Sequence, residues 1–483
     1  MVRIFNLGKD PSKSLETTVT VFLFVLLIII FIDNTQLVAQ PNKISPKRSK
    51  FLLLDSRIIE KVENAELRVG TVKKSPANPL FREEKLWEKR FDNLYGNVIF
   101  DKQENLFKCW YSPFIVDYSA KGMNLEQRKK KYEAPPNREM AICYAISKDG
   151  IHWEKPNLGL VEYDGSKQNN IIWRGPHGAG IFKDYHEKDP ARQYKAIFKG
   201  SQGLSVSFSS DGIHWSKSIK CKGVDVAGDT HNNAFWAPTL GKYVAITRTW
   251  GEMGREVARI ESNDFINWTK EEVVLTGKNK NLQTYAMPVF FYGGVYLGLV
   301  AIHDQKADRV WTELTWSPDT RTWHRIDPGT PLIPCSEKKL DYDYGCVYAC
   351  ATPVFLKNEI RLYYGGSDWL HFGWRNGSFC LATLRPDGFA GYVQKLNDKP
   401  AIITTKPIPY SQGKIRLTAD VENGGWVKVS IFDANGNQIF KSRSISKTVT
   451  DEPLDWKGEK KSDNIYLKFE FKKAKLYSFS FSD

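Results

Sequence analysis

The sequence predicts an all-β protein, in which a five-bladed β-propeller is followed by a small C-terminal β-sandwich. A seven-residue phrase, Ser147–Trp153 (SKDGIHW), returns at intervals of 53 to 68 residues, which is the mark of a repeat architecture. Pairs of short apolar strands precede the copies, so the repeat unit is a propeller blade and not a helical pair. After Tyr392 the period stops and short alternating strands follow. The other copies are Ser209–Trp215 (SSDGIHW), Ser262–Trp268 (SNDFINW), Ser317–Trp323 (SPDTRTW) and a form without the Trp at Arg385–Phe389 (RPDGF).

The repeated phrase is typical of a hairpin turn with an aromatic anchor. Asp followed by Gly or another turn former bonds its own downstream backbone, and the Trp starts the next strand and packs between sheets. We therefore predict that the repeated acids are turn residues and not catalysts. They are Asp149, Asp211, Asp264 and Asp319.

Residues 1–40 are expected to be a targeting segment. Arg3, Lys9 and Lys13 precede the apolar run Val19–Ile32, which is short for a membrane span. An export signal is favoured, with an uncleaved membrane anchor as the alternative. Either interpretation places the body of the protein in the periplasm, on the cell envelope or outside the cell.

The composition is that of a globular protein with an excess of basic residues. The 483 residues are 41% hydrophobic, and the net charge of +14 would suit an acidic partner such as a sulfated or uronate-containing glycan. Nucleic acid is not expected, because the one dense basic run, Arg128–Lys131, sits in a polar insertion typical of a solvated loop. We expect a lead-in at 41–90, the propeller at 91–395 and an accessory sandwich at 400–483.

Each blade is predicted to begin with two apolar strands. In a propeller the first strand of each blade lines the central channel, so the residues that open these strands should converge on one mouth. The pairs Gly293-Gly294 and Gly365-Gly366 are predicted to be hairpin turns. The predicted strand pairs are 93–100 with 106–114, 179–182 with 194–198, 233–236 with 242–247, 285–291 with 295–302, and 347–356 with 360–365.

Polar and aromatic residues cluster where these inner strands begin. Four of the five entries offer hydrogen-bonding groups to the same mouth, and the aromatic rings beside them could stack on sugar faces. No ligand spacing supports a metal site there, and no cofactor is expected, although a structural or channel metal ion stays open. The candidate binding residues are Asn93, His231, Asn232, Trp236, Tyr285, His303, Asp343, Trp369 and His371.

Carboxyl groups at the mouth indicate a possible chemistry. Cleavage of a glycosidic bond needs one protonated and one ionised carboxyl group, and Asp92, Asp229 and Asp343 could supply such a pair. Two further acids, Asp184 and Glu313, are candidates from other strands. The structural alternative for each Asp is a cap or turn residue, and for Glu313 it is a solvated position on the outside of a strand.

Other enzyme classes find no support in the sequence. It contains no Gly-rich phosphate loop, no HExxH motif, no GxSxG elbow and no paired Cys clusters for zinc. Seven Cys are present in an odd number without CxxC spacing, so most are expected to be small buried hydrophobic residues.

Three segments carry a resemblance to a known group. Phe91–Tyr95 (FDNLY), Asp229–Trp236 (DTHNNAFW) and Leu384–Gly391 (LRPDGFAG), with five turn units and a trailing sandwich, resemble the five-bladed propeller glycoside hydrolases of families 32, 43, 68 and 117. The match is nearest to exported bacterial family-32-like proteins and spans about residues 90–483. It implies that Asp92 is the nucleophile or base, that Asp184 orients substrate and tunes the acid, and that Asp229 or Glu313 is the general acid.

The sequence therefore predicts an exported glycoside hydrolase that acts on a plant or algal glycan. A non-catalytic carbohydrate-binding propeller is the alternative, in which the aromatic residues and His231 hold sugar without a carboxylate pair. A protein-interaction propeller is a third possibility, and it predicts an apolar patch at the mouth instead of clustered acids.

Overall fold

The computed structural model describes residues 49–410, 413–456 and 464–482, and almost all of their regular structure is β-strand. One short helix, α2 (Leu125–Arg128), and two 3₁₀ turns, η1 (Ser56–Ile58) and η2 (Pro190–Arg192), are its helical elements in these ranges. The predicted signal at residues 1–40 lies outside the described residues. Within the described ranges, no helix has the length and apolar character needed to cross a membrane.

The first three blades are four-stranded antiparallel sheets in chain order, with one short addition to the first. In each, the first strand lies at one edge and the later strands extend outward. Blade 1 contains β6 (Asn97–Asp101), β7 (Leu106–Tyr111), β9 (Glu139–Ser147) and β10 (Ile171–Arg174), with β8 (Phe114–Val116) on β9. Blade 2 contains β11 (His177–Lys183), β12 (Tyr194–Gly200), β13 (Gly203–Ser209) and β14 (Ile219–Lys220). Blade 3 contains β15 (Asn233–Ala237), β16 (Lys242–Gly251), β17 (Gly254–Ser262) and β18 (Glu272–Leu275).

In the last two blades the inner strand is split into two short segments. Blade 4 contains β19 (Leu282–Thr284), β20 (Val289–Tyr292), β21 (Val295–Asp304), β22 (Arg309–Ser317) and β23 (His324–Arg325). Blade 5 contains β24 (Cys346–Ala349), β25 (Val354–Phe355), β26 (Ile360–Ser367) and β27 (Gly377–Leu384). Its outer edge is completed by β4 (Lys73–Lys74) and β5 (Phe81–Arg82), which come from the N-terminal side of the propeller.

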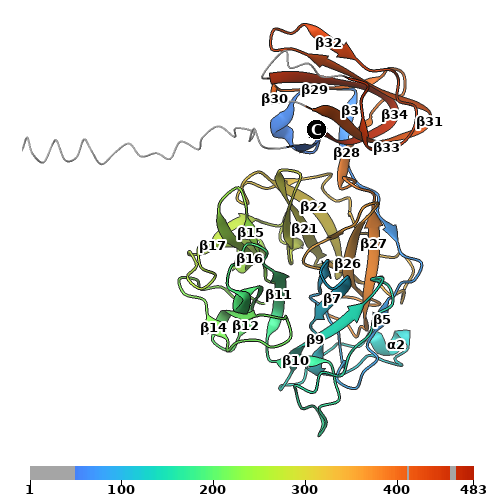
Figure 1. Ribbon diagram of the computed structural model, residues 1–483. Coiled ribbons are helices and arrows are strands. Elements are labelled where there is room, and N and C mark those ends of the chain that lie inside the picture. Colours follow the sequence, from blue (N-terminus) through green and yellow to red (C-terminus); the bar gives the residue numbers. More distant parts are fainter. Residues whose placement is uncertain (1–48, 411–412, 457–463, 483) are drawn as a thin grey trace, which may run out of the picture. The chain divides into compact units, whose positions relative to one another are not determined.

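The blades form a closed ring. β6 contacts β11, β11 contacts β15, and β15 contacts β20, while β21 contacts β24 and β25 returns to β6. Strands of all five blades are arranged around a common centre (Figure 1). The predicted five-bladed propeller is therefore confirmed.

The repeated phrase forms the turns that the sequence predicts. Asp211 Oδ1 accepts hydrogen bonds from the backbone N–H groups of Ile213 and His214, both at 2.8 Å, and the same pattern recurs at the other three acids. The residue after the Asp has a left-handed backbone in these four turns, with φ of +72° at Gly150, +80° at Gly212, +68° at Phe265 and +67° at Thr320. Local backbone bonding thus explains all four acids, and they have a structural role.

The C-terminal sandwich recruits strands from both ends of the described chain. Its central strand order is β2–β29–β34–β28–β3, and the two 19-residue strands β31 and β34 pair with each other. The sandwich also collects four short strands around these. The bounds are β1 (Lys50–Leu52), β2 (Ile59–Glu63), β3 (Ala65–Val69), β28 (Ala390–Gln394), β29 (Ala401–Thr405), β30 (Ile408–Pro409), β31 (Lys414–Phe432), β32 (Gln438–Lys441), β33 (Val449–Pro453) and β34 (Asn464–Ser482).

Two predicted boundaries are wrong. The segment 41–90 is no separate lead-in, because β1 to β3 belong to the sandwich and β4 and β5 to blade 5. The propeller ends at Leu384 instead of 395, since β28 pairs with β3 and β34. The copy of the phrase that lacks the Trp, Arg385–Phe389, lies at this boundary. The Asp387 carboxylate accepts hydrogen bonds from Lys50, Tyr292 and Ser478, and so connects this turn to the sandwich and to blade 4.

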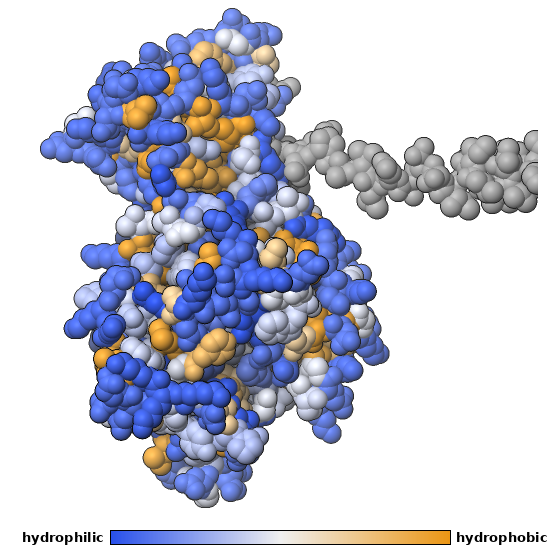
Figure 2. Space-filling model, turned by 180° about the vertical axis from the view of Figure 1, so that it is seen from behind, coloured by the Kyte–Doolittle hydropathy of each residue, from blue (hydrophilic) through white to orange (hydrophobic). Residues whose placement is uncertain are grey.

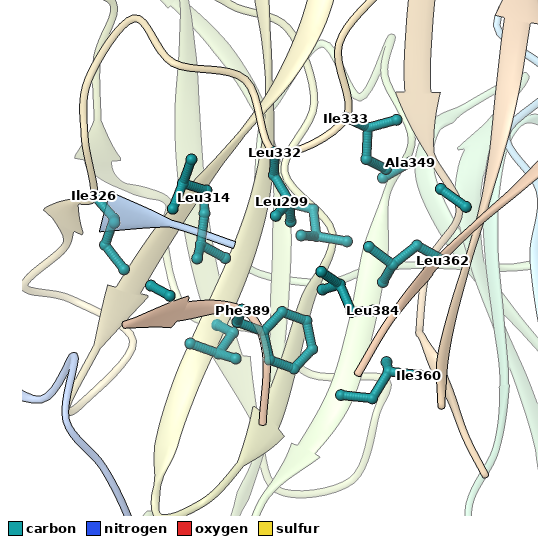
Figure 3. Close-up of a cluster of buried hydrophobic side chains, with 14 of the residues drawn as sticks. Leu299, Leu314, Ile326, Leu332, Ile333, Ala349, Ile360, Leu362, Leu384 and Phe389 are labelled. Carbon is teal, nitrogen blue, oxygen red and sulfur yellow. The ribbon is translucent and has the colours of Figure 1, made fainter. Parts of the chain in front are cut away.

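Apolar side chains fill the space between neighbouring blades. Leu299 and Leu314 of blade 4 meet Leu362 and Leu384 of blade 5 in one buried cluster, next to Phe389 (Figure 3). The outer surface of the propeller is mainly hydrophilic on the side shown in Figure 2, and apolar side chains gather there on a face of the sandwich. The packed blades form a rigid support for the loops at the channel mouth.

Candidate functional site

The loop that precedes blade 1 has an unusual backbone. Asp92, Leu94 and Tyr95 all have left-handed φ angles, of +55°, +63° and +47°. Non-glycine residues adopt this region at an energetic cost, and such residues cluster at functional sites. The loop packs against Gly365, where a Cβ atom would lie 2.9 Å from the Asn93 carbonyl oxygen. The predicted turn at Gly365-Gly366 is wrong, because both glycines lie inside β26 and make room for this loop.

Asp92 is surrounded by three guanidinium groups. Its Oδ1 lies 2.7 Å from Arg375 Nη2, 3.1 Å from Arg90 Nε and 3.5 Å from Arg138 Nη2. Burial by itself would raise the pKa of Asp92, but the attraction to Arg375, and then to Arg90 and Arg138, holds the pKa well below its usual range. Asp92 is therefore an ionised carboxylate at neutral pH.

Asn93 connects three blades through its side chain. Its Nδ2 donates to the hydroxyl oxygens of Tyr95 at 2.9 Å and Tyr285 at 3.1 Å, and its Oδ1 accepts from Arg375 Nη2 at 3.0 Å. Tyr285 lies between β19 and β20 of blade 4, and Arg375 lies in the loop between β26 and β27 of blade 5. The amide thus fixes the positions of groups that the sequence spreads over almost 300 residues.

A second carboxylate, Asp229, comes from the loop before blade 3. Its Oδ1 lies 2.7 Å from His177 Nε2 at the start of β11, and its Oδ2 accepts from Arg248 Nη2 at 2.7 Å. The close contact with His177 and the charge of Arg248 hold the pKa of Asp229 below its usual range. The Asp229 side chain is half-exposed, so this group faces the solvent side of the mouth.

Blades 4 and 5 add a group of neutral rings. The His371 and His303 ring centres lie 4.5 Å apart, and the Tyr285 ring lies 4.9 Å from His371. Burial lowers the pKa of both histidines, and nearby arginines lower that of His371 further. At the rim, Trp250 and Phe372 are each more than half exposed and offer flat apolar faces to solvent.

A cavity of about 520 Å³ adjoins the mouth between blades 1 and 2. It is large enough for a sugar unit and combines aromatic walls with positive charge. His177 and Arg138 line this cavity, and His177 contacts Asp229 while Arg138 contacts Asp92, so two lining residues connect the cavity to the carboxylates. Its other aromatic and basic lining residues are Phe114, Trp173, Arg174, Phe198 and Lys199.

Some predicted site residues belong to the cluster around Asp92 and Asp229, and others hold the neighbouring loops in place. Asp92, Asn93, Asp229, Tyr285, His303 and His371 meet as described. His231 is buried, with its Nε2 3.2 Å from Asn97 Oδ1, and burial lowers its pKa to about 3. Asn232 donates to the backbone oxygens of Gly178 and Gly228 and shapes the loop that carries Asp229. These two residues are structural.

Two predicted catalytic acids lie elsewhere. Asp184 follows the end of β11 opposite to His177, about 20 Å along the strand at 3.3 Å per residue. It is paired with Lys195 at 3.0 Å and accepts from the Tyr243 hydroxyl at 2.7 Å. Glu313 is buried on β22 and accepts from Trp311 Nε1 at 2.9 Å. Neither has a described contact with the mouth, so the structure places both acids outside the cluster around Asp92 and Asp229.

Three predicted binding residues also fall outside the cluster. Asp343 is fully buried, paired with Lys74 and bonded to the Tyr364 hydroxyl. Trp236 stacks on His186 at 3.8 Å, in the region of Asp184, and Trp369 stacks on Tyr344. Their side chains pack within or between blades.

The arginine and histidine side chains that surround the two carboxylates were not predicted from the sequence, apart from His303 and His371. The residues not predicted are Arg90, Arg138, His177, Arg248, Arg255 and Arg375. One signal was present in the sequence: Arg248 interrupts the apolar strand β16, where a charged residue needs a partner.

Glu83 connects the loop before blade 1 to the start of β27. Its Oε1 accepts from the backbone N–H groups of Phe91 at 2.7 Å and Gly377 at 2.8 Å. Burial raises the pKa of Glu83 from 4.5 to about 8. Between these two values the folded protein holds a proton that the unfolded chain releases, so this group makes the protein less stable as pH rises from 4.5 to 8.

We expect Glu83→Gln to remove this contribution, because the amide oxygen can still accept both hydrogen bonds without a titrating proton. Each pKa unit corresponds to about 1.4 kcal/mol, so the wild type should lose on the order of several kcal/mol across the window relative to the variant. Urea unfolding of both proteins at pH 5, 6, 7 and 8 measures the difference. Parallel pH dependence of the two free energies would contradict the assignment.

Comparison with known proteins adds the following. No family model matches the chain, and no curated protein matches it. Among solved structures, a β-1,2-mannobiose phosphorylase from Listeria innocua is 14% identical with a TM-score of 0.44, covering 65% of this chain and 96% of its own. An α-L-arabinofuranosidase from Podospora anserina is 11% identical with a TM-score of 0.44, covering 66% and 98%. A family 43 arabinoxylan arabinofuranohydrolase from Bacillus subtilis is 11% identical with a TM-score of 0.39, covering 84% and 97%. Similarity at this level identifies neither a family nor an activity.

Proposed function

We propose that the protein is an exported glycoside hydrolase that cleaves a plant or algal oligo- or polysaccharide at the propeller mouth. The observation that carries this proposal is the pair of ionised carboxylates, Asp92 and Asp229, which come from different blades and contact Arg138 and His177 in the lining of one cavity of about 520 Å³. Exposed aromatic rings at the rim suit the apolar faces of sugars. The clustered charges also speak against a protein-interaction propeller with an apolar mouth.

In this proposal Asp92 attacks the anomeric carbon or removes a proton from the attacking water. Its three arginine neighbours keep it ionised, which both roles require. The glycosidic C–O bond breaks, and the departing oxygen must receive a proton. Asp229 is ionised and cannot donate one, so we assign proton donation to His177, whose Nε2 lies 2.7 Å from Asp229 Oδ1. Asp229 is then a positioning residue instead of the acid.

His177→Gln is expected to lower kcat by about 100-fold or more with a smaller change in KM, because a glutamine cannot donate a proton to the leaving group. His214→Gln is a matched control, since His214 pairs with a turn aspartate, Asp211, at the same 2.7 Å and is not among the residues that line the cavity. Steady-state kinetics on a cleaved oligosaccharide measures both. Equal activity of His177→Gln and wild type would remove His177 from the mechanism.

A second function is favoured by one observation. Both carboxylates are held in ion pairs with arginines, an arrangement that also suits a non-catalytic carbohydrate-binding propeller. Purified protein should be incubated with labelled neutral, uronate-containing and sulfated oligosaccharides, with chromatography for cleavage and calorimetry for binding. Cleavage supports the hydrolase. Tight binding without cleavage supports the second function, and neither result with any glycan would refute both.

A further inference from the structure

Two arginines of blade 3 lie side by side at the mouth. Arg248 on β16 and Arg255 on β17 belong to the same hairpin, in which Trp250 is the direct cross-strand partner of Arg255. Each guanidinium lies 5.1 Å from the centre of the Tyr285 ring. Each also lies within 5.5 Å of the Trp250 ring centre, so the four side chains form one group.

The positive charge of this pair is incompletely neutralised. Arg248 is 2% exposed and has one carboxylate partner, Asp229, which it shares with His177. Its Nε and Nη1 are buried without a hydrogen-bond acceptor. Arg255 donates from Nη1 to the neutral Gln283 amide at 2.9 Å, and its Nε is buried without an acceptor. In the described part of the chain, no carboxylate lies within ion-pair distance of Arg255.

The surroundings do not supply the missing negative charge. Asp92 is already shared among three other arginines. The neighbouring rings of His303 and His371 are neutral because burial lowers their pKa. Burial lowers the pKa of Arg255, and the neighbouring charge of Arg248 lowers it further, as expected for two cations held close together. A bound anion would relieve this repulsion and accept the free N–H groups.

We propose that Arg248 and Arg255 form an oxyanion subsite, which binds a sulfate or carboxylate group carried by the glycan or a free inorganic oxyanion. Arginine suits this role because its planar fork of N–H donors matches the oxygens of such groups. The glycan source rests on the proposed function, whereas binding of a free oxyanion does not. The excess of basic residues in the chain is in line with an acidic ligand.

Calorimetric titration of the full chain with inorganic sulfate tests the subsite itself. Arg255→Gln is expected to weaken sulfate binding by about tenfold or more, since it removes a charged donor. Arg321→Gln, which removes an exposed arginine paired with Glu261 and Glu272, should bind as wild type does. Arg255→Lys keeps the positive charge but loses the planar set of guanidinium N–H donors. If Arg255→Gln does not fold, sulfate binding is measured in Arg255→Lys instead. Sulfate binding unaffected by both substitutions at Arg255 would overturn the proposal.

A second titration identifies the source of the oxyanion. The probes are a sulfated galactan tetrasaccharide and its desulfated counterpart, and neither measurement depends on cleavage. Tighter binding of the sulfated sugar by about tenfold, with the preference lost in Arg255→Gln, assigns the group to the glycan. Equal binding of both sugars, with sulfate binding still dependent on Arg255, assigns the subsite to a free oxyanion. A preference for the sulfated sugar that survives in Arg255→Gln would contradict the role of this arginine.

Discussion

Asp92→Asn is expected to abolish glycan cleavage, with kcat at least about 1,000-fold below wild type. An amide cannot attack the anomeric carbon or take a proton from water. The amide oxygen can still accept hydrogen bonds from Arg375 and Arg90, which bond to Asp92 Oδ1 at 2.7 Å and 3.1 Å, so the loop should keep its position. Product release by wild type and variant at saturating substrate measures the effect.

The matched control for this substitution is Asp211→Asn. Asp211 is an aspartate of the repeated turns, where its carboxylate oxygen accepts backbone N–H groups from Ile213 and His214. We expect wild-type kcat from this control and a small loss of stability. Retained activity in Asp92→Asn, or equal losses in both variants, would rule out the catalytic role of Asp92.

Arg375→Met is expected to lower the free energy of unfolding by about 3–5 kcal/mol, the usual effect of removing one partner from a buried ion pair. Arg375 is 1% exposed and bonds to the Asp92 carboxylate, to Asn93 Oδ1 and to Ser367 Oγ. Methionine fills most of the volume but makes none of these hydrogen bonds, and it removes the charge nearest to the Asp92 carboxylate. Urea unfolding at pH 7 gives the difference in stability.

Arg321→Met serves as the control for stability. Arg321 is 43% exposed and forms ion pairs on the outer side of the propeller, where such pairs contribute about 0–1 kcal/mol. A loss at Arg375 no larger than the loss at Arg321 would show that the buried cluster does not stabilise the mouth.

The propeller could be predicted from the sequence because its evidence is local and repeated. Each turn phrase bonds to its own backbone, so Asp149 or Asp211 indicates a turn without knowledge of distant residues. The domain boundary could not be predicted in the same way. β3 and β28 pair across more than 300 residues, and nothing in either segment alone specifies its partner.

The candidate site could be predicted in part for the same reason. Asp92 and Asp229 precede inner strands, and their place in the repeat brings them to the mouth. Arg375 is 283 residues from Asp92, so their contact depends on closure of the ring. Asp184 could not be placed correctly from the sequence. It follows the end of β11 opposite to the mouth, and the sequence alone does not show which end of a strand lies at the mouth.

The crystal structure of the Asp92→Asn variant with a bound oligosaccharide tests the central claim most directly. We expect the sugar to lie at the propeller mouth, with its anomeric carbon next to the side chain at position 92 and its leaving-group oxygen within hydrogen-bond distance of His177. We also expect contact with the cavity wall formed by Trp173 and Lys199. A sugar bound on the sandwich or on the outer strands of the blades, with an empty mouth, would contradict the account.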